Sequence, residues 1–391
     1  MTDWITDSFR AEFDKQAAAL GRVNLGIFGK TGVGKSTLVN AIFGAEVART
    51  GIGEPVTQGS HLYLDRRGHL GLLDTRGLEI GRDDKDLLKD LEKSIKEMRR
   101  RPLFEQIHAA WYCVRGMDRR FEAAEAAFIR KLDELDVPVI LVFTQVPKNG
   151  DLFHPDAVTL AESIIAMDLP ILGGRPFMTN AVRDQFTGQS VHGLTDVLDA
   201  TFHAAPDAVA SALNAAQTVD LARKGKEAQR VIAGASAAAV AAAASPIPFS
   251  DAAMLVPIQL GMMARIGQLY GIRFERAALA AIASTTAATQ GGRAAFTGLL
   301  KFIPGAGTVA GGALSAGVAS SLTFAMGQAW LAVCQRVARG GLRGVDGALD
   351  NTQLKDLFVE EFRKRMPRVR READVLTTDD PPRPPEPNRA G

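Results

Sequence analysis

The sequence has little cysteine and almost no net charge, and each shortage excludes a class of protein. Only two of its 391 residues are cysteines, Cys113 and Cys334, and they show neither metal-ligand spacing nor a disulfide framework. Lys and Arg number 46 against 44 Asp and Glu, so the net charge of +2 gives no global attraction to nucleic acid, and we expect no sequence-specific nucleic-acid binding. The opening residues lack the basic start and apolar run of a signal peptide. We therefore expect a protein of the reducing cytoplasm.

The composition changes sharply near residue 205. Before this point, short apolar runs alternate with amphipathic charged segments, which predicts an α/β fold with a doubly wound, mostly parallel sheet. The expected strands are Val23–Phe28, Leu70–Leu73, Ala109–Val114, Val137–Phe143 and Pro176–Met178. After it, long Ala- and Gly-rich runs predict a mainly α-helical domain. The predicted organisation is an N-terminal helix (1–20), the α/β domain (21–204), the helical domain (205–373) and a disordered tail (374–391).

Residues Gly29 to Ser36, with the sequence GKTGVGKS, match the pattern G-x-x-x-x-G-K-[ST] between an apolar strand and a helical segment. This P-loop pattern binds phosphates because successive backbone N–H groups and a helix N-terminus face the anion. Lys35 is expected to neutralise the β- and γ-phosphates, and Ser36 to bind Mg²⁺. The full set expected to contact nucleotide here is Gly29, Lys30, Thr31, Gly32, Val33, Gly34, Lys35, Ser36 and Thr37.

Two later segments are predicted to complete the phosphate site. Asp74 ends the apolar run LGLLD and is expected to hold Mg²⁺ through water, while Gly77 donates its N–H to the γ-phosphate. Thr57 follows Glu54-Pro55-Val56 in a glycine-rich segment that we expect to be a loop. A threonine there reaches Mg²⁺ and the γ-phosphate only when a triphosphate is bound, so Thr57 is the candidate switch residue.

The order and spacing of these motifs, over about residues 20–200, resemble the Era/TrmE-like branch of the translation-factor-related GTPases. The resemblance implies GTP or GDP with Mg²⁺ as ligands. The family's base-reading motif, Asn/Thr-Lys-x-Asp, falls on Thr144-Gln145-Val146-Pro147, so Gln145 replaces the lysine and Pro147 the aspartate. Asn180-Ala181 falls on the family's second base loop, and Asp151 is a further candidate for the missing carboxylate. We expect the protein to bind GTP more tightly than ATP, with a smaller difference in affinity than in the family.

The position after Gly77 is Leu78, where Ras-like enzymes carry a glutamine that orients water. An apolar side chain cannot do this, so Arg49 or Arg76 is the candidate source of transition-state charge. We therefore expect slow intrinsic hydrolysis of GTP, which dimerisation through the GTPase domain or a partner would stimulate.

The second half resembles a bacterial helical domain family of unknown function, number 697. The resemblance rests on Gln259, Tyr270-Gly271, the segment TFAMGQAW at 323–330 and two proline-containing turns at 245–251 and 301–307. It assigns no reaction, but the family includes inner-membrane proteins. The uncharged runs Val231–Ser250 and Phe302–Gln335 are long enough to span a bilayer.

Alanine and glycine dominate both runs, which favours a soluble helical domain, with reversible membrane association as the alternative. The basic segment from Arg363 to Arg371 would aid such association.

The sequence thus predicts a GTP-binding switch whose nucleotide state controls contacts of residues 205–373 with a membrane or a protein partner. Two alternatives stay open. Pro147 in the base-reading motif is compatible with a P-loop ATPase or kinase, and Leu78 is compatible with a scaffold that binds nucleotide only for stability.

Overall fold

The computed structural model describes residues 2–44, 52–57, 60–74, 84–243, 251–272, 316–344 and 348–365. The chain divides into two compact units. One contains Ala11–Arg230 and Ala264–Arg273, and the other contains Met1–Arg10, Val231–Met263 and Phe274–Gly391. Helix α1 (Thr2–Leu20) contributes residues to both.

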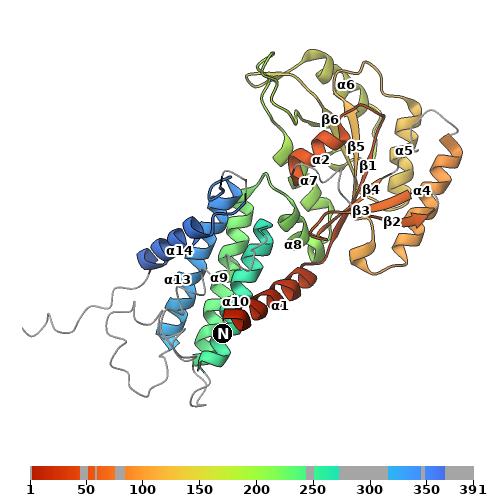
Figure 1. Cartoon of the computed structure of the whole chain (residues 1–391). Coiled ribbons are helices and arrows are strands. Elements are labelled where there is room, and N and C mark those ends of the chain that lie inside the picture. The colour runs from red at the N-terminus through yellow and green to blue at the C-terminus, as the bar shows by residue number, and fades with distance from the viewer. Residues whose placement is uncertain are drawn as a thin grey trace, which may run out of the picture. The chain divides into compact units, whose positions relative to one another are not determined.

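The first of these units is built on a seven-stranded sheet in the order β2-β3-β4-β1-β5-β6-β9 (Figure 1). The neighbours β4, β1, β5, β6 and β9 are parallel, while β2–β3 and β3–β4 are antiparallel. The strands are β1 (Val23–Phe28), β2 (Ile52–Thr57), β3 (Ser60–Leu64), β4 (Leu70–Asp74), β5 (Ala109–Arg115), β6 (Val139–Thr144) and β9 (Phe177–Met178). The predicted mostly parallel α/β sheet is confirmed.

The segment Glu54–Thr57, which we expected to be a loop, is a strand instead. It belongs to β2, the edge strand, which pairs with β3 and has an irregular register between Pro55 and Thr57. An edge strand tolerates proline because an N–H on its outer side needs no partner in the sheet. Proline and glycine therefore concealed the strand in the sequence.

Helices cover both faces of the sheet and bury two apolar clusters (Figure 1). Trp111 of β5 stacks on Phe43 at 5.6 Å between ring centroids and donates its indole N–H to Thr201 Oγ1 at 2.9 Å. The short elements β7 (Lys148–Asn149) and β8 (Leu152–Phe153) form a separate hairpin, and η1 (Leu103–Glu105) and η2 (Leu172–Gly174) are single turns. One face carries α4 (Asp84–Arg99), α5 (Ala123–Glu134) and α6 (Pro155–Ile165), and the other α2 (Lys35–Phe43), α7 (Leu194–Ala204) and α8 (Asp207–Ala216).

The remaining described elements are helical, as predicted for the second half. They are α9 (Leu221–Ala243), α10 (Asp251–Tyr270), α13 (Ala316–Ala338) and α14 (Asn351–Arg365). In the second unit, Trp330 donates its indole N–H to Met263 O at 2.8 Å, and Gln259 Nε2 donates to Thr323 Oγ1 at 3.2 Å. These buried contacts join α10 to α13 through residues that the family resemblance had singled out. Of the two predicted proline-containing turns, residues 245–250 and 301–307 lie outside the described residues, and Asp251 starts α10.

Candidate nucleotide site

The predicted phosphate-binding segments meet at one edge of the sheet, at the carboxyl ends of the parallel strands. Strand β4 is in register with β1, with Leu73 opposite Gly26, so Asp74 ends beside the strand that leads into Gly29. His61 pairs with Asp74. Thr57, the last residue of β2, pairs with Ser60, the first residue of β3 and the neighbour of His61. The backbone therefore places the end of β4, with Asp74, beside the end of β1 that leads into the P-loop, and Thr57 at the same end of the sheet, on the edge strand β2. For Thr57 and Asp74 the structure describes the backbone alone.

Three glycines shape the loop between β1 and α2, and each has a positive φ. The values are 122° at Gly29, 80° at Gly32 and 95° at Gly34, a region that other residues rarely adopt. A Cβ at Gly29 would lie 2.1 Å from Cys113 O, so β5 excludes any larger residue there. Gly34 caps α2 in the left-handed conformation, and its carbonyl accepts from Leu38 N at 2.9 Å. The loop leads directly into the N-terminus of α2, and a glycine-rich loop before a helix N-terminus is an arrangement that binds anions.

Two lysines hold the loop in different ways. Lys35 Nζ donates to Gly29 O and to Lys30 O, both at 2.7 Å, so its ammonium lies over the loop. Lys30 Nζ lies 2.7 Å from Glu122 and 3.4 Å from Glu125, at the start of α5. Partial burial opposes the charge of Lys30, but these carboxylates outweigh it and raise the pKa of Lys30. Lys30 therefore anchors the loop to α5, while Lys35, the lysine predicted to neutralise the phosphates, bonds carbonyls of the loop itself. Sequence reasoning missed this anchor because the two glutamates lie over 90 positions away.

Thr144 and Gln145, predicted to lie near the base, contact the P-loop directly. Buried Thr144 donates its hydroxyl to Val33 O and lies 3.3 Å from Val114 O. Gln145 has φ 55°, and its Nε2 lies 3.3 Å from the position that a Cβ on Gly34 would take. The end of β6 therefore braces the phosphate loop.

We expect Thr144→Val to lower nucleotide affinity by about 10-fold, because Val33 O loses its buried donor at a cost of about 1–2 kcal/mol. Isothermal titration with GDP measures this. Thr201→Val is the matched control, since Thr201 is also buried but lies on α7 and bonds Trp111. Equal affinity losses in both variants would show a general folding effect and contradict the bracing role.

The second predicted base loop is held by its own hydrogen bonds. Asn180 Nδ2 donates to Val182 O at 2.7 Å and to Ser190 O at 2.9 Å, so its amide donors are engaged. His192 pairs with Asn180 along the backbone, and its Nε2 lies 3.0 Å from Val146 O. These contacts tie the loop at 180–192 to the segment after Thr144 and fix Ala181 between them. His192 was not predicted, and no local pattern marks it.

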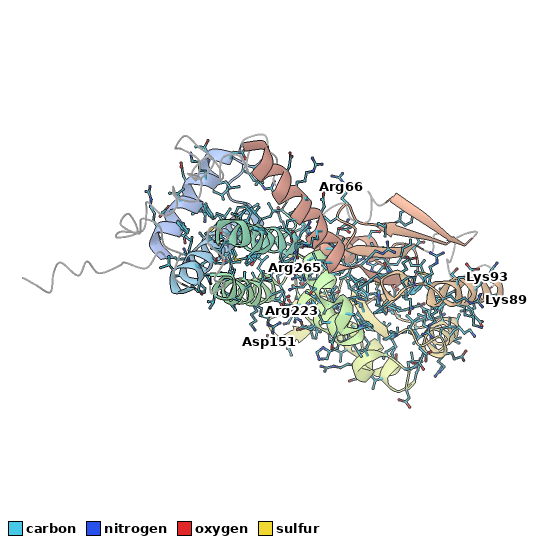
Figure 2. All side chains as sticks on the ribbon, turned by 90° about the horizontal axis from the view of Figure 1, so that it is seen from below. Arg66, Lys89, Lys93, Asp151, Arg223 and Arg265 are labelled. Carbon is cyan, nitrogen blue, oxygen red and sulfur yellow. The ribbon has the colours of Figure 1, made fainter. Side chains whose placement is uncertain are left out.

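The other predicted residues lie on the surface or outside the described part of the chain. Asp151 lies in the turn between β7 and β8, fully exposed and 3.7 Å from Lys148 Nζ (Figure 2). Arg49, Arg76 and Gly77 lie outside the described residues, as does Leu78. Ser36 and Thr37 are exposed in the first turn of α2, where a hydroxyl can face a ligand.

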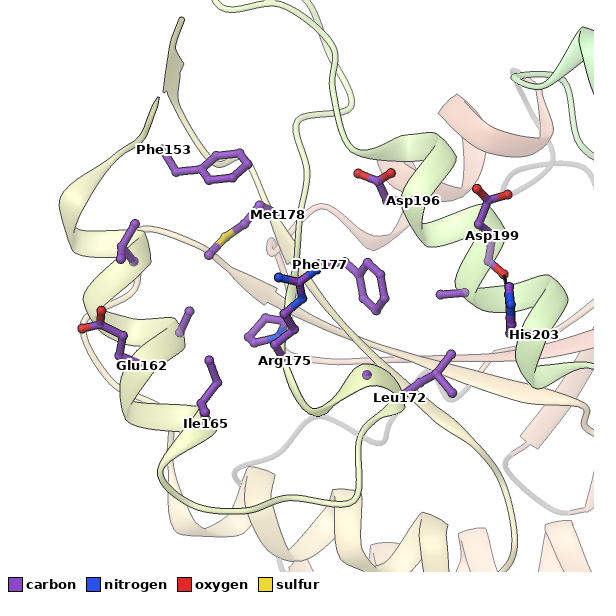
Figure 3. Close-up of a pocket in the computed structure, with 15 residues that line it drawn as sticks. Phe153, Glu162, Ile165, Leu172, Arg175, Phe177, Met178, Asp196, Asp199 and His203 are labelled. Atoms are coloured by element: carbon purple, nitrogen blue, oxygen red, sulfur yellow. Dashed lines mark hydrogen bonds between the residues drawn. The ribbon is translucent and has the colours of Figure 1, made fainter. Parts of the chain in front are cut away.

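A pocket of about 780 Å³ lies elsewhere, between α6 and α7 against β9 (Figure 3). Its lining is mainly apolar, including Ile165, Phe177 and Met178, with Arg175 and the α7 carboxylates among the polar groups. None of the predicted nucleotide residues lines it. Within the described ranges, no group of three His, Cys, Asp or Glu side chains is placed to hold a metal.

Two known protein families match this chain, one in each of its two halves. The profile of the 50S ribosome-binding GTPase family matches residues 24–145, and that of a domain of unknown function, DUF697, matches residues 209–352. The resemblances to a P-loop GTPase and to family 697 are confirmed.

One relative and one solved structure are also similar. Magnetosome membrane protein 22 of Magnetospirillum gryphiswaldense is 34% identical over 98 residues, 24% of this chain and 50% of the relative. The chain thus matches about half the length of that relative. A crystal structure of "a probable GTP-binding protein engB" is 17% identical, covers 46% of this chain and 98% of that chain, and has a TM-score of 0.29.

Proposed function

We propose that this chain, which carries a domain of the 50S ribosome-binding GTPase family followed by a DUF697 domain, is a GTP-binding switch with slow Mg²⁺-dependent hydrolysis. Its nucleotide state controls the contacts that residues 205–373 make with a membrane or a protein partner. The observation that carries the proposal is the P-loop, shaped by three positive-φ glycines and braced by Thr144. A loop held in this way is organised for phosphate before any ligand arrives.

The donors present fit a Mg²⁺-nucleotide. The N–H groups of residues 29–36 and the N-terminus of α2 face the phosphates, and the Lys35 ammonium supplies the countercharge. Ser36 and Thr57 offer hydroxyls to the metal, and Asp74 a carboxylate through water. Bound Mg²⁺ would neutralise charge that develops on the phosphate oxygens. With Leu78 at the water-orienting position, Arg49, Arg76 or a second copy of the domain must stabilise that charge, which accounts for slow turnover.

The backbone N–H of Ala181 supports a preference for guanine over adenine nucleotides. Among the described residues, the Ala181 N–H has no hydrogen-bond partner, while its neighbour Asn180 is held on both sides. A backbone donor at this place matches the O6 acceptor of guanine and opposes the N6 amino group of adenine. Pro147 supplies no carboxylate, so this contact and the shape of the site carry the discrimination.

Titration of the purified full chain with fluorescent GTP, GDP and ATP, with and without Mg²⁺, tests the proposal. We expect tighter binding of GTP than of ATP, and phosphate release that rises with protein concentration if dimerisation assists. Tighter ATP binding would favour the ATPase or kinase alternative. Tight GTP binding without any phosphate release would favour the scaffold alternative.

Thr57→Ala is expected to spare GDP binding and to weaken binding of a non-hydrolysable GTP analogue by about 10-fold, through loss of one metal ligand. The reason is that Thr57, at the end of β2, is proposed to reach the metal only when the γ-phosphate is present. Parallel titrations with the two nucleotides measure the effect. Equal losses for both would contradict the switch assignment.

The helical region is proposed to associate with membranes reversibly. Within the described part of the chain, one helical stretch, Gly317–Ala338, is long and apolar enough to cross a bilayer, with a mean hydropathy of 1.3. About 61% of it is already buried against its neighbours, which favours a packed helix over a span. The relative named as a magnetosome membrane protein supports membrane contact.

We expect the full chain to co-sediment with anionic vesicles and to be released by carbonate, because α14 ends in Arg363, Lys364 and Arg365. Neutral vesicles serve as the control. Carbonate-resistant pelleting would indicate a spanning helix, and failure to bind vesicles in every nucleotide state would contradict membrane association.

A further inference from the structure

The turn between β3 and β4 is bound to the helices that follow the sheet. Asp65 Oδ1 accepts from His69 N at 2.8 Å and from Leu70 N at 3.0 Å, which fixes the turn. Arg67 then donates from Nη1 to Ala215 O and from Nη2 to Ala216 O, both at 3.0 Å. These carbonyls end α8, where a cation is favoured by the helix dipole and by unpaired acceptors.

Lys224 of α9 binds the same helix end from another side. Its side chain is only 2% exposed, and its ammonium donates to Asn214 O at 2.7 Å, Ala215 O at 3.0 Å and Leu269 O at 2.5 Å. Burial, together with Arg67, lowers the pKa of Lys224 well below its usual value. Three backbone carbonyls lie within hydrogen-bond distance of Nζ, so this polar group has partners although it is buried. Ala215 O is thus shared by Arg67 and Lys224.

The end of α10 closes around the same turn. His69 Nε2 lies 3.4 Å from Gln268 Oε1, and Gln268 Nε2 donates to Phe13 O of α1 at 3.1 Å. Gly271 has φ 66°, and a Cβ there would lie 2.1 Å from Arg67 Nη1. The positive φ favours glycine, and any other residue would displace the Arg67 guanidinium, which gives a physical reason for the glycine of the Tyr270-Gly271 pair that the sequence analysis singled out.

The P-loop helix is joined to this region as well. Thr218, in the connection from α8 to α9, donates its N–H to Ile42 O at 2.8 Å and its hydroxyl to the same oxygen at 3.1 Å. Ile42 belongs to the last turn of α2, whose first turn carries Lys35 and Ser36. The turn that leads into β4 and Asp74 therefore bonds to the segment at 214–224, and so does helix α2, which starts at the P-loop.

We propose that the junction formed by Arg67, Lys224 and the Ala215 carbonyl transmits the nucleotide state of β3 and β4 to helices α9 and α10. Strand β4 starts directly after the turn and ends at Asp74, so the candidate metal ligand lies only seven positions after Arg67 in the chain. Helices α9 and α10 contribute residues to both compact units, and they are thereby suited to carry a signal along the chain. The inference rests on the proposed function, because it needs a nucleotide that binds differently in its two states.

Hydrogen–deuterium exchange of the full chain with GDP or with a non-hydrolysable GTP analogue tests this coupling. In the wild type we expect exchange in 221–243 and 251–272 to differ between the two nucleotides by about threefold to tenfold. In Arg67→Ala this difference is lost, while protection of residues 29–44 by both nucleotides is kept. Arg66→Ala is the matched control, since Arg66 is the exposed neighbour in the same turn (Figure 2).

Two further variants keep the test decisive if Arg67→Ala unfolds. Arg67→Lys keeps the charge but replaces the guanidinium, whose Nη1 and Nη2 each reach one carbonyl, with a single ammonium on a shorter side chain, so it should give a reduced difference. Lys224→Met should also reduce the difference, whereas the exposed control Lys226→Met should leave it unchanged. A wild type that protects 29–44 yet shows no difference in α9 and α10, or an Arg67→Ala variant with the full difference, overturns the coupling. Absence of any protection at 29–44 instead refutes the proposed nucleotide site.

Discussion

Lys35→Ala is expected to lower the affinity for Mg²⁺-GTP and Mg²⁺-GDP by at least about 100-fold, the loss of a charge-assisted phosphate contact worth about 3 kcal/mol. The ammonium of Lys35 lies 2.7 Å from Gly29 O and from Lys30 O, so it is held over the loop where phosphate would enter. Among the described residues of the loop, Lys30 cannot replace it, because Glu122 and Glu125 already bind its ammonium. Fluorescence titration with labelled GDP measures the loss.

The control for Lys35→Ala is Lys96→Ala, a lysine of α4 paired with Glu92 on the surface. This variant should bind nucleotide like the wild type, since its ion pair is exposed and weak. Circular dichroism must show that Lys35→Ala still melts cooperatively. If a folded Lys35→Ala variant binds GDP with unchanged affinity, the assignment of residues 29–36 as the phosphate site is wrong.

The parts of the fold that the sequence predicted well are those fixed by local pattern. The strand Val23–Phe28 has the predicted bounds, because an uninterrupted apolar run followed by glycine permits little else. The helix over Asp84–Arg99 likewise has leucine and isoleucine at helical spacing along a charged segment. The P-loop follows such a strand and leads into a helix, and the two glycines that its pattern fixes, Gly29 and Gly34, both take a positive φ.

The parts that escaped prediction depend on contacts between distant residues. Strand β2 contains Pro55, and only pairing with β3 at the edge of the sheet makes it a strand. Gln145 takes φ 55°, which is unfavourable for glutamine alone and arises where β6 meets the P-loop. Arg67 and Ala215 are 148 positions apart, and Lys224 looks like any helical lysine in the sequence although it is buried. No periodicity reports such contacts, because they are set by how the elements pack.

The replacement of Pro147 by aspartate is expected to raise the preference for GTP over ATP by about 100-fold, or about 2.7 kcal/mol. A carboxylate at this position can accept from N1–H and from the 2-amino group of guanine, and adenine has neither donor. The backbone around it is held without help from the proline ring. Val146 N donates to Thr179 O at 2.9 Å, and Pro147 O accepts from His154 N at 3.0 Å. Both bonds survive the substitution.

Competition titrations of GTP and ATP against labelled GDP measure the preference in Pro147→Asp, in Pro147→Ala and in the wild type. Pro147→Ala separates the loss of the proline from the gain of the carboxylate, so its preference should stay close to that of the wild type. A rise confined to Pro147→Asp would locate residues 144–147 at the purine, with Thr144 bracing the phosphate loop and residue 147 facing the base. Equal behaviour of the two variants would mean that the base lies elsewhere, and guanine preference would then have to come from the loop at 180–192, where Ala181 supplies a backbone donor.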